Sequence, residues 1–198
     1  MKKSLFIIVT GIVFSLYSNT NNIQPTNQET NNTIYSFSDN RIEAPTGYSW
    51  VKLKAIKSYV LQPKGWFFNV EQQNKTYAYF VTKEDYTKDP NQMFSTGLSL
   101  NALTNIGSRN AVDFANGMFV NLKKQGTVLE SKKFDDKNLT GNIFIVQIDN
   151  TIIEYKIIAN KKTNKVYIAS FESPADKWEE NKKIANTILD NLNFNQDF

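Results

Sequence analysis

The stretch KVYIASFESPADKWEENKKIANTILDNLNF, residues 165–194, decides the fold class because it places a strand directly before an amphipathic helix. Residues 165–171 are rich in β-branched and aromatic side chains, which is typical of a strand. Ser173 is then expected to cap the helix, with Pro174 at its first position and Asp176 three residues after the cap. Apolar residues recur at helical spacing and predict this buried stripe: Trp178, Ala185, Ile188, Leu189 and Leu192.

Working back from this stretch, alternation of apolar and polar residues predicts several more strands. They cover residues 48–61, 76–82, 94–100, 128–134, 141–149 and 151–159. In the second of them, Tyr77, Tyr79 and Val81 share one face, and in the third Phe94 is expected to share a face with Leu98 and Leu100. Short turns between strands make them antiparallel.

Between the two halves of this pattern, residues 110–125 carry apolar side chains at the spacing of an amphipathic helix. Its predicted stripe consists of Ala111, Phe114, Ala115, Met118, Phe119 and Leu122. Asn110 is the expected N-cap and Gly126 the end signal. Gly117 inside the helix is expected to mark close packing against the sheet. A mostly antiparallel sheet with a few helices predicts an α+β domain.

Three parts of the chain resemble the PsbP-like family: LQPKGWFF (61–68), NAVDFANGMFVNLKKQ (110–125) and above all residues 165–194. The last part matches the family's strand, Ser-Pro and final amphipathic helix at Val166, Tyr167, Phe171, Ser173, Pro174, Leu192 and Phe194. The resemblance implies an α/β/α sandwich with a central antiparallel sheet, and a binding or assembly role more than an enzymatic one. The family's photosystem role is not carried over, because no ion-binding residues can be mapped onto this chain.

The chain of 198 residues contains no His and no Cys. Catalytic triads based on His, thiolate nucleophiles, His or Cys zinc sites and disulfides are therefore excluded. No Gly-rich phosphate loop or nucleophile elbow is present either. We therefore expect a protein that is not an enzyme and carries no cofactor.

The N-terminus is expected to direct export. Lys2 and Lys3 precede a short apolar run, residues 5–16, which is typical of a signal peptide and too short for a good membrane span. The predicted organisation is a signal at 1–18, a disordered tether rich in Asn, Thr and Gln at 19–40, and a single domain at 41–198. The protein is expected to be periplasmic or extracellular, bacterial, and not inserted in a membrane once the signal is removed; an uncleaved anchor is the alternative.

The charge of the chain argues against a nucleic-acid partner. The formal net charge is +4, and removal of Lys2 and Lys3 leaves 21 basic against 19 acidic residues, or +2. That balance is too even for a nucleic-acid or anionic-membrane binder on charge alone.

The stretch LQPKGWFF also supplies the candidate binding residues. Residues 62–65 fit a type I turn with Gly65 at its fourth position. Alternation then places Trp66 and Phe68 on one side, expected in the core, and Phe67 on the other. The binding candidates are Lys64, Phe67, Tyr48 and Trp50.

Acidic side chains offer weaker candidates. Asp135, Asp136 and Asn138 lie close together and could supply oxygen ligands to Ca²⁺, although the spacing of an EF-hand is absent and a solvated hairpin is the competing interpretation. Glu84, Asp85 and Asp89 form a similar loop. Glu154, set in an apolar strand, is expected on a solvated face beside Lys156.

Two main functions follow from these observations. The first is an exported, monomeric, non-enzymatic binding or assembly module of PsbP-like type that docks a protein of the cell envelope. The alternative is a small-ligand carrier or a weak carboxylate-dependent hydrolase, which needs convergent polar groups in a concave site. A self-associating surface protein is a third possibility.

Overall fold

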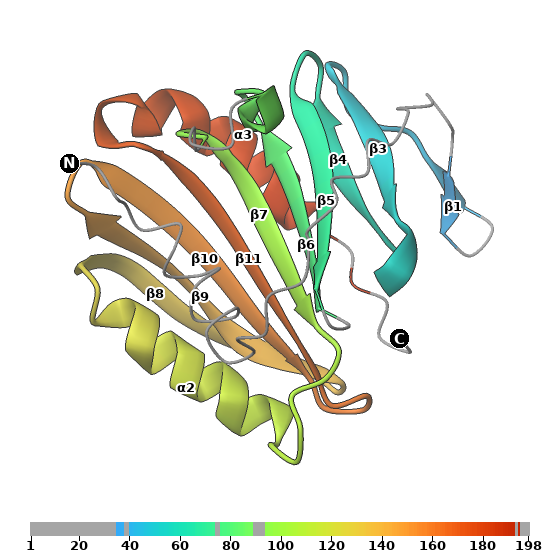
Figure 1. Ribbon diagram of the computed structural model, residues 1–198, viewed down its shortest axis with the longest axis vertical. Coiled ribbons are helices and arrows are strands. Elements are labelled where there is room, and N and C mark those ends of the chain that lie inside the picture. Colours follow the sequence, from blue (N-terminus) through green and yellow to red (C-terminus); the bar gives the residue numbers. More distant parts are fainter. Residues whose placement is uncertain (1–34, 38–39, 74–75, 89–93, 193, 195–198) are drawn as a thin grey trace.

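The computed structural model describes residues 35–37, 40–73, 76–88, 94–192 and 194. Seven strands form one antiparallel sheet in the order β5-β6-β7-β11-β10-β9-β8. Their bounds are β5 Phe67–Gln73, β6 Thr76–Thr82, β7 Gly97–Leu103, β8 Thr127–Asp135, β9 Leu139–Ile148, β10 Thr151–Asn160 and β11 Lys165–Pro174. Helices α2 (Ala111–Lys123) and α3 (Trp178–Asp190) flank this sheet (Figure 1).

The inner strand β10 shows why the helices lie on opposite faces. Ile153, Tyr155 and Ile157 pack in the cluster that contains the buried residues of α2. The alternate residues Ile152 and Ile158 pack in the cluster that contains those of α3. Because successive side chains of a strand point to opposite faces, the sheet has an apolar core on each side. The predicted α+β class, with helices on both sides of an antiparallel sheet, is confirmed.

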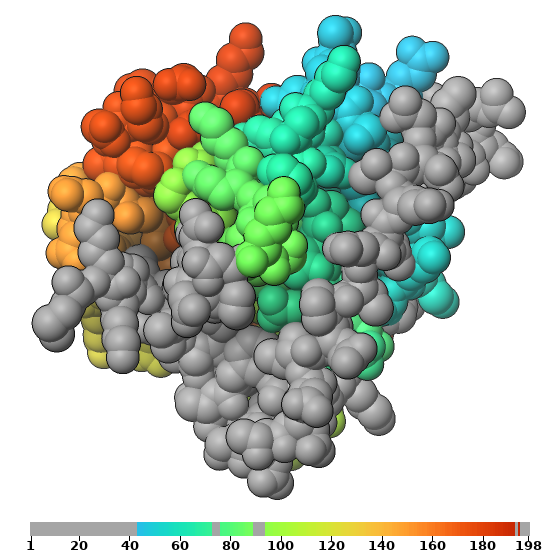
Figure 2. Space-filling view, turned by 45° about the horizontal axis from the view of Figure 1, so that its top comes forward, coloured from blue at the N-terminus to red at the C-terminus, as the bar shows by residue number. Residues whose placement is uncertain are grey.

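A separate hairpin shares the α3 face of the sheet. Its strands are β3 (Tyr48–Leu53) and β4 (Ser58–Pro63), joined by the 3-10 turn η1 (Lys54–Ile56). The prediction of a single strand over residues 48–61 was therefore wrong, because Lys57 adopts a left-handed conformation (φ 50°) and the chain reverses there. In Figure 2 the red atoms of α3 adjoin the blue atoms of this hairpin, and both supply side chains to the α3-side core.

Near the N-terminus, β1 (Tyr35–Phe37) pairs with β2 (Asn40–Ile42) across the predicted boundary between tether and domain. The predicted signal peptide and most of the predicted tether lie outside the described residues. Among the described residues, none of the helices combines the length and apolar character that a membrane span requires.

Helix α2 begins as the sequence predicts. The side chain of Asn110 accepts hydrogen bonds from the backbone N–H groups of Val112 (2.8 Å) and Asp113 (3.4 Å), which satisfies donors that the helix leaves unpaired. Four of the six predicted stripe residues are fully buried, whereas Phe114 and Phe119 are half-buried. Gly117 is exposed, and a Cβ placed there would contact nothing within 4 Å, so the expected close packing is absent.

Helix α3 begins four residues later than the sequence predicts. Ser173 and Pro174 remain in β11, where they pair with Ile152 and Thr151 of β10. A 3-10 turn, η3 (Ala175–Lys177), follows, and the helix proper starts at Trp178. The long ladder between β10 and β11 holds the predicted cap in the sheet, and the Ser173 hydroxyl instead accepts a hydrogen bond from Asn181 Nδ2 at 2.8 Å. The predicted buried stripe of this helix is confirmed.

One further face assignment was wrong. Leu98 and Leu100 belong to the α3-side core, but Phe94 precedes β7 and packs with Phe80 on the other side of the sheet. Tyr86, from the 3-10 turn η2 (Tyr86–Lys88), completes this small aromatic cluster, with its ring 5.7 Å from that of Phe94.

Candidate functional site

The turn before β5 sets the position of the predicted binding residues. The N–H group of Trp66 donates to the carbonyl oxygen of Pro63 at 3.1 Å, and Gly65 has a φ of +83°. The turn therefore spans residues 63–66, one residue later than predicted, with Gly65 at its third position. The shift arises because Pro63 still pairs with Tyr48 at the end of the β3–β4 hairpin. A positive φ at this position favours glycine.

The three aromatic rings after the turn divide as the alternation predicts. Trp66 stacks on Phe171 of the central strand β11, with ring centroids 6.3 Å apart, and Phe68 stacks on Tyr79 at 6.5 Å. Both pack against the α3-side core. Phe67 points to the other side and keeps 40% of its surface exposed. An exposed phenylalanine on a strand at the edge of the sheet is the feature of this region that packing does not explain.

A basic side chain lies near Phe67, and another belongs to the turn before it. The Nζ atom of Lys88 lies 5.9 Å from the centroid of the Phe67 ring and 3.1 Å from a carboxylate oxygen of Asp85. Lys64 is exposed, and its backbone N–H donates to the carbonyl oxygen of Gly47 at 2.8 Å, which ties the turn to the start of β3. We call Tyr48, Lys64 and Phe67 the docking surface, since the turn brings them to one end of the domain.

The four binding candidates are thus not equivalent. Lys64 and Phe67 are exposed, and Tyr48 is half-buried where it packs against the α3-side core. Trp50 is only 7% exposed and belongs to that core. Trp50 is buried because it lies on β3, whose residues Val51 and Leu53 also pack in the α3-side core.

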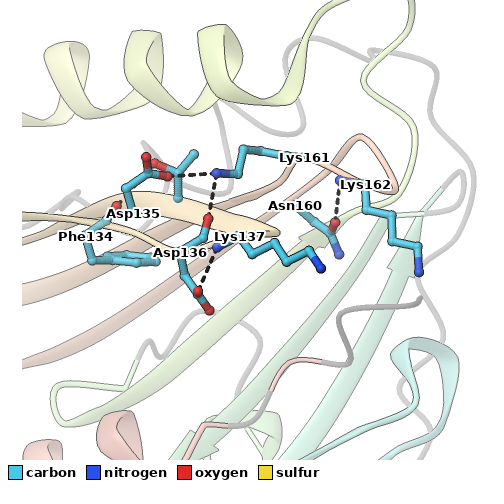
Figure 3. A network of polar contacts seen from close by, with 8 residues as sticks. Phe134, Asp135, Asp136, Lys137, Asn160, Lys161 and Lys162 are labelled. Atoms are coloured by element: carbon cyan, nitrogen blue, oxygen red, sulfur yellow. Dashed lines mark hydrogen bonds and ion pairs between the residues drawn. The ribbon is translucent and has the colours of Figure 1, made fainter.

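A lysine binds the loop that was predicted as a metal candidate. Lys161 Nζ donates to Asp135 Oδ1 at 2.9 Å and to the backbone oxygen of Asp136 at 2.6 Å (Figure 3). The Lys161 backbone N–H also donates to the Asn138 carbonyl oxygen at 2.8 Å. Lys161 thus supplies the positive charge at this loop and joins the β8–β9 turn to the β10–β11 turn.

The electrostatics of this loop agree with its geometry. The hydrogen bond from Lys161 holds the pKa of Asp135 below its usual range. The other carboxylate of the loop, on Asp136, accepts from the backbone N–H of Lys137 at 2.7 Å. Across the described part of the chain, no group of three acidic side chains is placed to hold a metal ion.

The second acidic loop is also held by its own neighbours. Glu84 accepts from the Ser95 hydroxyl at 2.6 Å, and Asp85 accepts from the Thr87 hydroxyl at 2.6 Å. Asp89 lies outside the described residues. The bond between Glu84 and Ser95 joins the two ends of the β6–β7 connection.

Glu154 and Lys156 are not on a solvated face. Both are half-buried beside α3, where Lys156 Nζ donates to the backbone oxygen of Leu189 at 3.0 Å. That bond places a cation at the C-terminal end of the helix, where the helix dipole favours it. Burial raises the pKa of Glu154, and the nearby Asp190 carboxylate adds to the effect. The expected solvated pair is therefore replaced by a contact that fastens α3 to β10.

Sequence reasoning missed a polar group on the α2 face of the sheet. Its members are Ser99, Asn101, Tyr155, Ser170 and Glu172. The signal was present in the sequence, since polar residues alternate with apolar ones in LSLNAL (98–103) and in IASFES (168–173). That pattern is usually a sign of a solvated face, yet the serines and the asparagine here are buried.

Comparison with known proteins gives a match among solved structures. No family model matches the chain, and no curated protein matches it. Among solved structures, the solution structure of cyanobacterial PsbP (CyanoP) from Synechocystis sp. PCC 6803 is similar at 14% sequence identity, with a TM-score of 0.48. The alignment covers 82% of this chain and 99% of that protein.

Proposed function

We propose that the protein is an exported, non-enzymatic binding module that docks a protein of the cell envelope through Tyr48, Lys64 and Phe67. The observation that carries the proposal is the exposure of Phe67, which keeps 40% of its surface in solvent while both neighbouring rings pack inward. Burying the remaining exposed surface of this ring on binding would contribute part of the roughly 1.5–3 kcal/mol that complete burial of a phenylalanine provides.

The charges around Phe67 indicate the chemistry of the partner. Lys64 and Lys88 are both exposed, and of the two only Lys88 forms an ion pair with a described residue, Asp85. An apolar side chain flanked by carboxylates would complement this surface, since opposite charges speed and orient association. Strand β5 is also the last strand of its sheet, so an extended segment of the partner could pair with its outer edge.

Site-specific photo-crosslinking in the producing cell tests this proposal. A photoreactive amino acid replaces Phe67 in the full chain, and the matched control replaces Val120, which is 49% exposed on α2. We expect a discrete crosslinked product from position 67 and none from position 120. The variant Lys64→Glu should weaken the product at position 67.

Identical products from both positions, or no product from position 67, would overturn the proposal. Circular dichroism of each variant establishes that the fold is intact. Both substituted side chains are exposed, so a loss of product cannot be attributed to a disrupted core.

A further inference from the structure

Strand β8 (Thr127–Asp135) forms the edge of the sheet opposite β5 (Figure 1). Seven of its nine side chains are exposed, and the other two, Val128 and Phe134, are half-buried. Among the described strands, only β9 pairs with β8, so one side of the β8 backbone is open to a further strand. An edge of this kind is a template for pairing with another chain.

The two helices leave this edge of the sheet accessible. Helix α2 packs mainly on β9, β10 and β11, and α3 packs mainly on β4, β10 and β11. Both helices are therefore centred over the inner strands, and a further strand could extend the sheet beside β8 without displacing either of them. It would also cover Leu129, which keeps 47% of its surface exposed at a β-bulge where it has no partner on β9.

The side of β8 that faces α3 carries one acidic and one basic residue in alternate positions. Glu130 pairs with Ile145 of β9, which packs in the α3-side core, so Glu130 faces that side. Lys132 lies two positions along the same strand and therefore faces the same way. Glu130 Oε1 lies 4.0 Å from Lys182 Nζ of α3, yet the Glu130 side chain remains 68% exposed. Lys132 is exposed and forms no ion pair with a residue that the structure describes, so both charges are accessible to a strand beside β8.

These two charges complement those of a second β8 strand. Two copies of a strand that pair antiparallel are related by a two-fold axis, which sets the residue before the axis opposite the residue after it. An axis through Ser131 sets Glu130 of each copy opposite Lys132 of the other, and opposite charges directly across two strands stabilise their pairing. The same axis brings Lys133 beside Leu129, whose exposed surface the aliphatic stem of the lysine can cover.

Other registers of the two strands fit less well. An axis through any charged residue of β8 would set that residue opposite its own copy, which is a like charge. An axis through Phe134 would set Lys133 opposite Asp135. That carboxylate is already bound by Lys161 Nζ at 2.9 Å, and β8 ends there. Ser131 is the middle residue of β8, so the axis through it also gives the longest overlap.

We propose that two copies of the chain associate through β8, paired antiparallel about Ser131, so that their two sheets join into one. The partner is a second copy because the same strand, reversed, supplies the opposite charge to both Glu130 and Lys132. Main-chain hydrogen bonds between the two β8 strands provide the attraction, and the two charge pairs fix the register.

This interface is independent of the docking surface. Phe67 lies on β5, at the opposite edge of the sheet, so each copy keeps its docking surface at an outer end of the joined sheet. Failure of one proposal therefore says nothing against the other. If both hold, the dimer carries two docking surfaces and attaches more firmly to a partner that is itself repeated.

Charge exchange on β8 tests the proposed interface. Sedimentation equilibrium of the full chain measures its average mass over about a hundredfold range of concentration, because association follows mass action. We expect the parent to pass from monomer toward dimer. Glu130→Lys and Lys132→Glu, each measured alone, should associate at least tenfold more weakly, since like charges then face each other. An equimolar mixture of these two variants should recover the association of the parent, and Phe67→Ala, the control, should retain it.

Disulfide trapping tests the register. The chain contains no cysteine, so Ser131→Cys introduces a single thiol at the axis. Cα atoms directly opposite each other in antiparallel strands are about 4.5–5.5 Å apart, which is within the reach of a disulfide. We expect a crosslinked dimer of Ser131→Cys on mild oxidation. Lys133→Cys on the same face is the matched control, since the two copies of that position lie four residues apart along the paired strands and should crosslink far less.

Thermal melts of each variant establish that the fold is intact, and several results would then overturn the proposal. One is a parent chain that stays monomeric at every concentration. Another is a charge-reversal variant that associates as the parent does, or a mixture of the two variants that fails to recover association. Equal crosslinking of Ser131→Cys and Lys133→Cys would contradict the register. Loss of association in Phe67→Ala would place the contact at β5 instead of β8.

Discussion

The Oδ1 atom of Asn164 accepts a hydrogen bond from the backbone N–H of Ala111 at 2.8 Å, across 53 positions of sequence. Asn164 lies in the β10–β11 turn, and Ala111 is the first residue of α2. The Nδ2 group of the same side chain donates to the backbone oxygen of Arg109 at 3.0 Å. One amide thus orients the start of the helix against the end of the sheet.

Removal of this amide should destabilise the fold. Asn164→Ala loses both bonds and places alanine at a φ of 53°, which favours asparagine or glycine. We expect a loss of about 1–2 kcal/mol of unfolding free energy, in the range of a lost helix cap. Urea denaturation monitored by circular dichroism measures it. Asn164→Gly keeps the backbone conformation and loses only the bonds, so an equal loss in both variants would assign the effect to the bonds.

The two large aromatic residues on the helices should differ in their contribution to stability. Trp178 is 4% exposed in the α3-side core, and Trp178→Ala should cost about 3–5 kcal/mol. Phe119 is half-buried, with its ring 5.0 Å from Phe144 and Lys123 Nζ 4.9 Å from its centroid. Phe119→Ala should therefore cost less, about 1–2 kcal/mol. Equal losses in chemical denaturation would contradict this ranking.

The helix stripes were predictable because apolar spacing reports the face that a helix buries. The start of α3 was not, since Ser173 and Pro174 match a helix start locally while the β10–β11 ladder holds them in the sheet. Long-range pairing prevailed over local preference there. The hairpin reversal at Lys57 was missed for a related reason: lysine gives no turn signal, and tertiary contacts of β3 and β4 impose its positive φ.

A glycine inside α2 offers a route to higher stability. Gly117 is exposed and a Cβ there would meet no atom within 4 Å, so Gly117→Ala should raise the unfolding free energy by about 0.5–1 kcal/mol. Gly65→Ala is the matched contrast. It meets no atom either, but its φ of +83° strains an alanine and should lower stability. Thermal melts of both variants give the two signs; a destabilising Gly117→Ala would refute the expectation.

The pH dependence of stability should report on Glu172. Its pKa is raised from the model-peptide range near 4.5 to about 8 in the folded protein, chiefly by burial, and the facing groups are Glu84 and Tyr155. Between these two values the folded protein keeps a proton on Glu172 that the unfolded chain has released. The stabilisation from this protonated carboxyl is complete below pH 4.5 and is lost as the pH rises through about 8. Glu172→Gln should show a flatter profile of unfolding free energy between pH 5 and 9. Parallel profiles for the two proteins would contradict the assignment.

The candidate sites were predictable to different degrees. Alternation correctly separated Phe67 from Trp66 and Phe68, because period-two spacing fixes which side chains share a face. The acidic loop was visible in the sequence, but its occupation by Lys161 was not, since that lysine comes from a turn 25 residues away. The polar group on the α2 face of the sheet was missed because alternation alone cannot distinguish a solvated face from a buried polar one.

The pairing of β7 with β11 has a consequence for the order of folding. Residues 97–103 find their partner at 166–172, so the strands from the first half of the domain cannot join the rest of the sheet until most of the chain is available. Closure of a loop this long slows folding and delays burial of the core. A nascent chain would therefore stay unfolded until its last strand and α3 had been made. Polypeptides are threaded through narrow channels in this unfolded state.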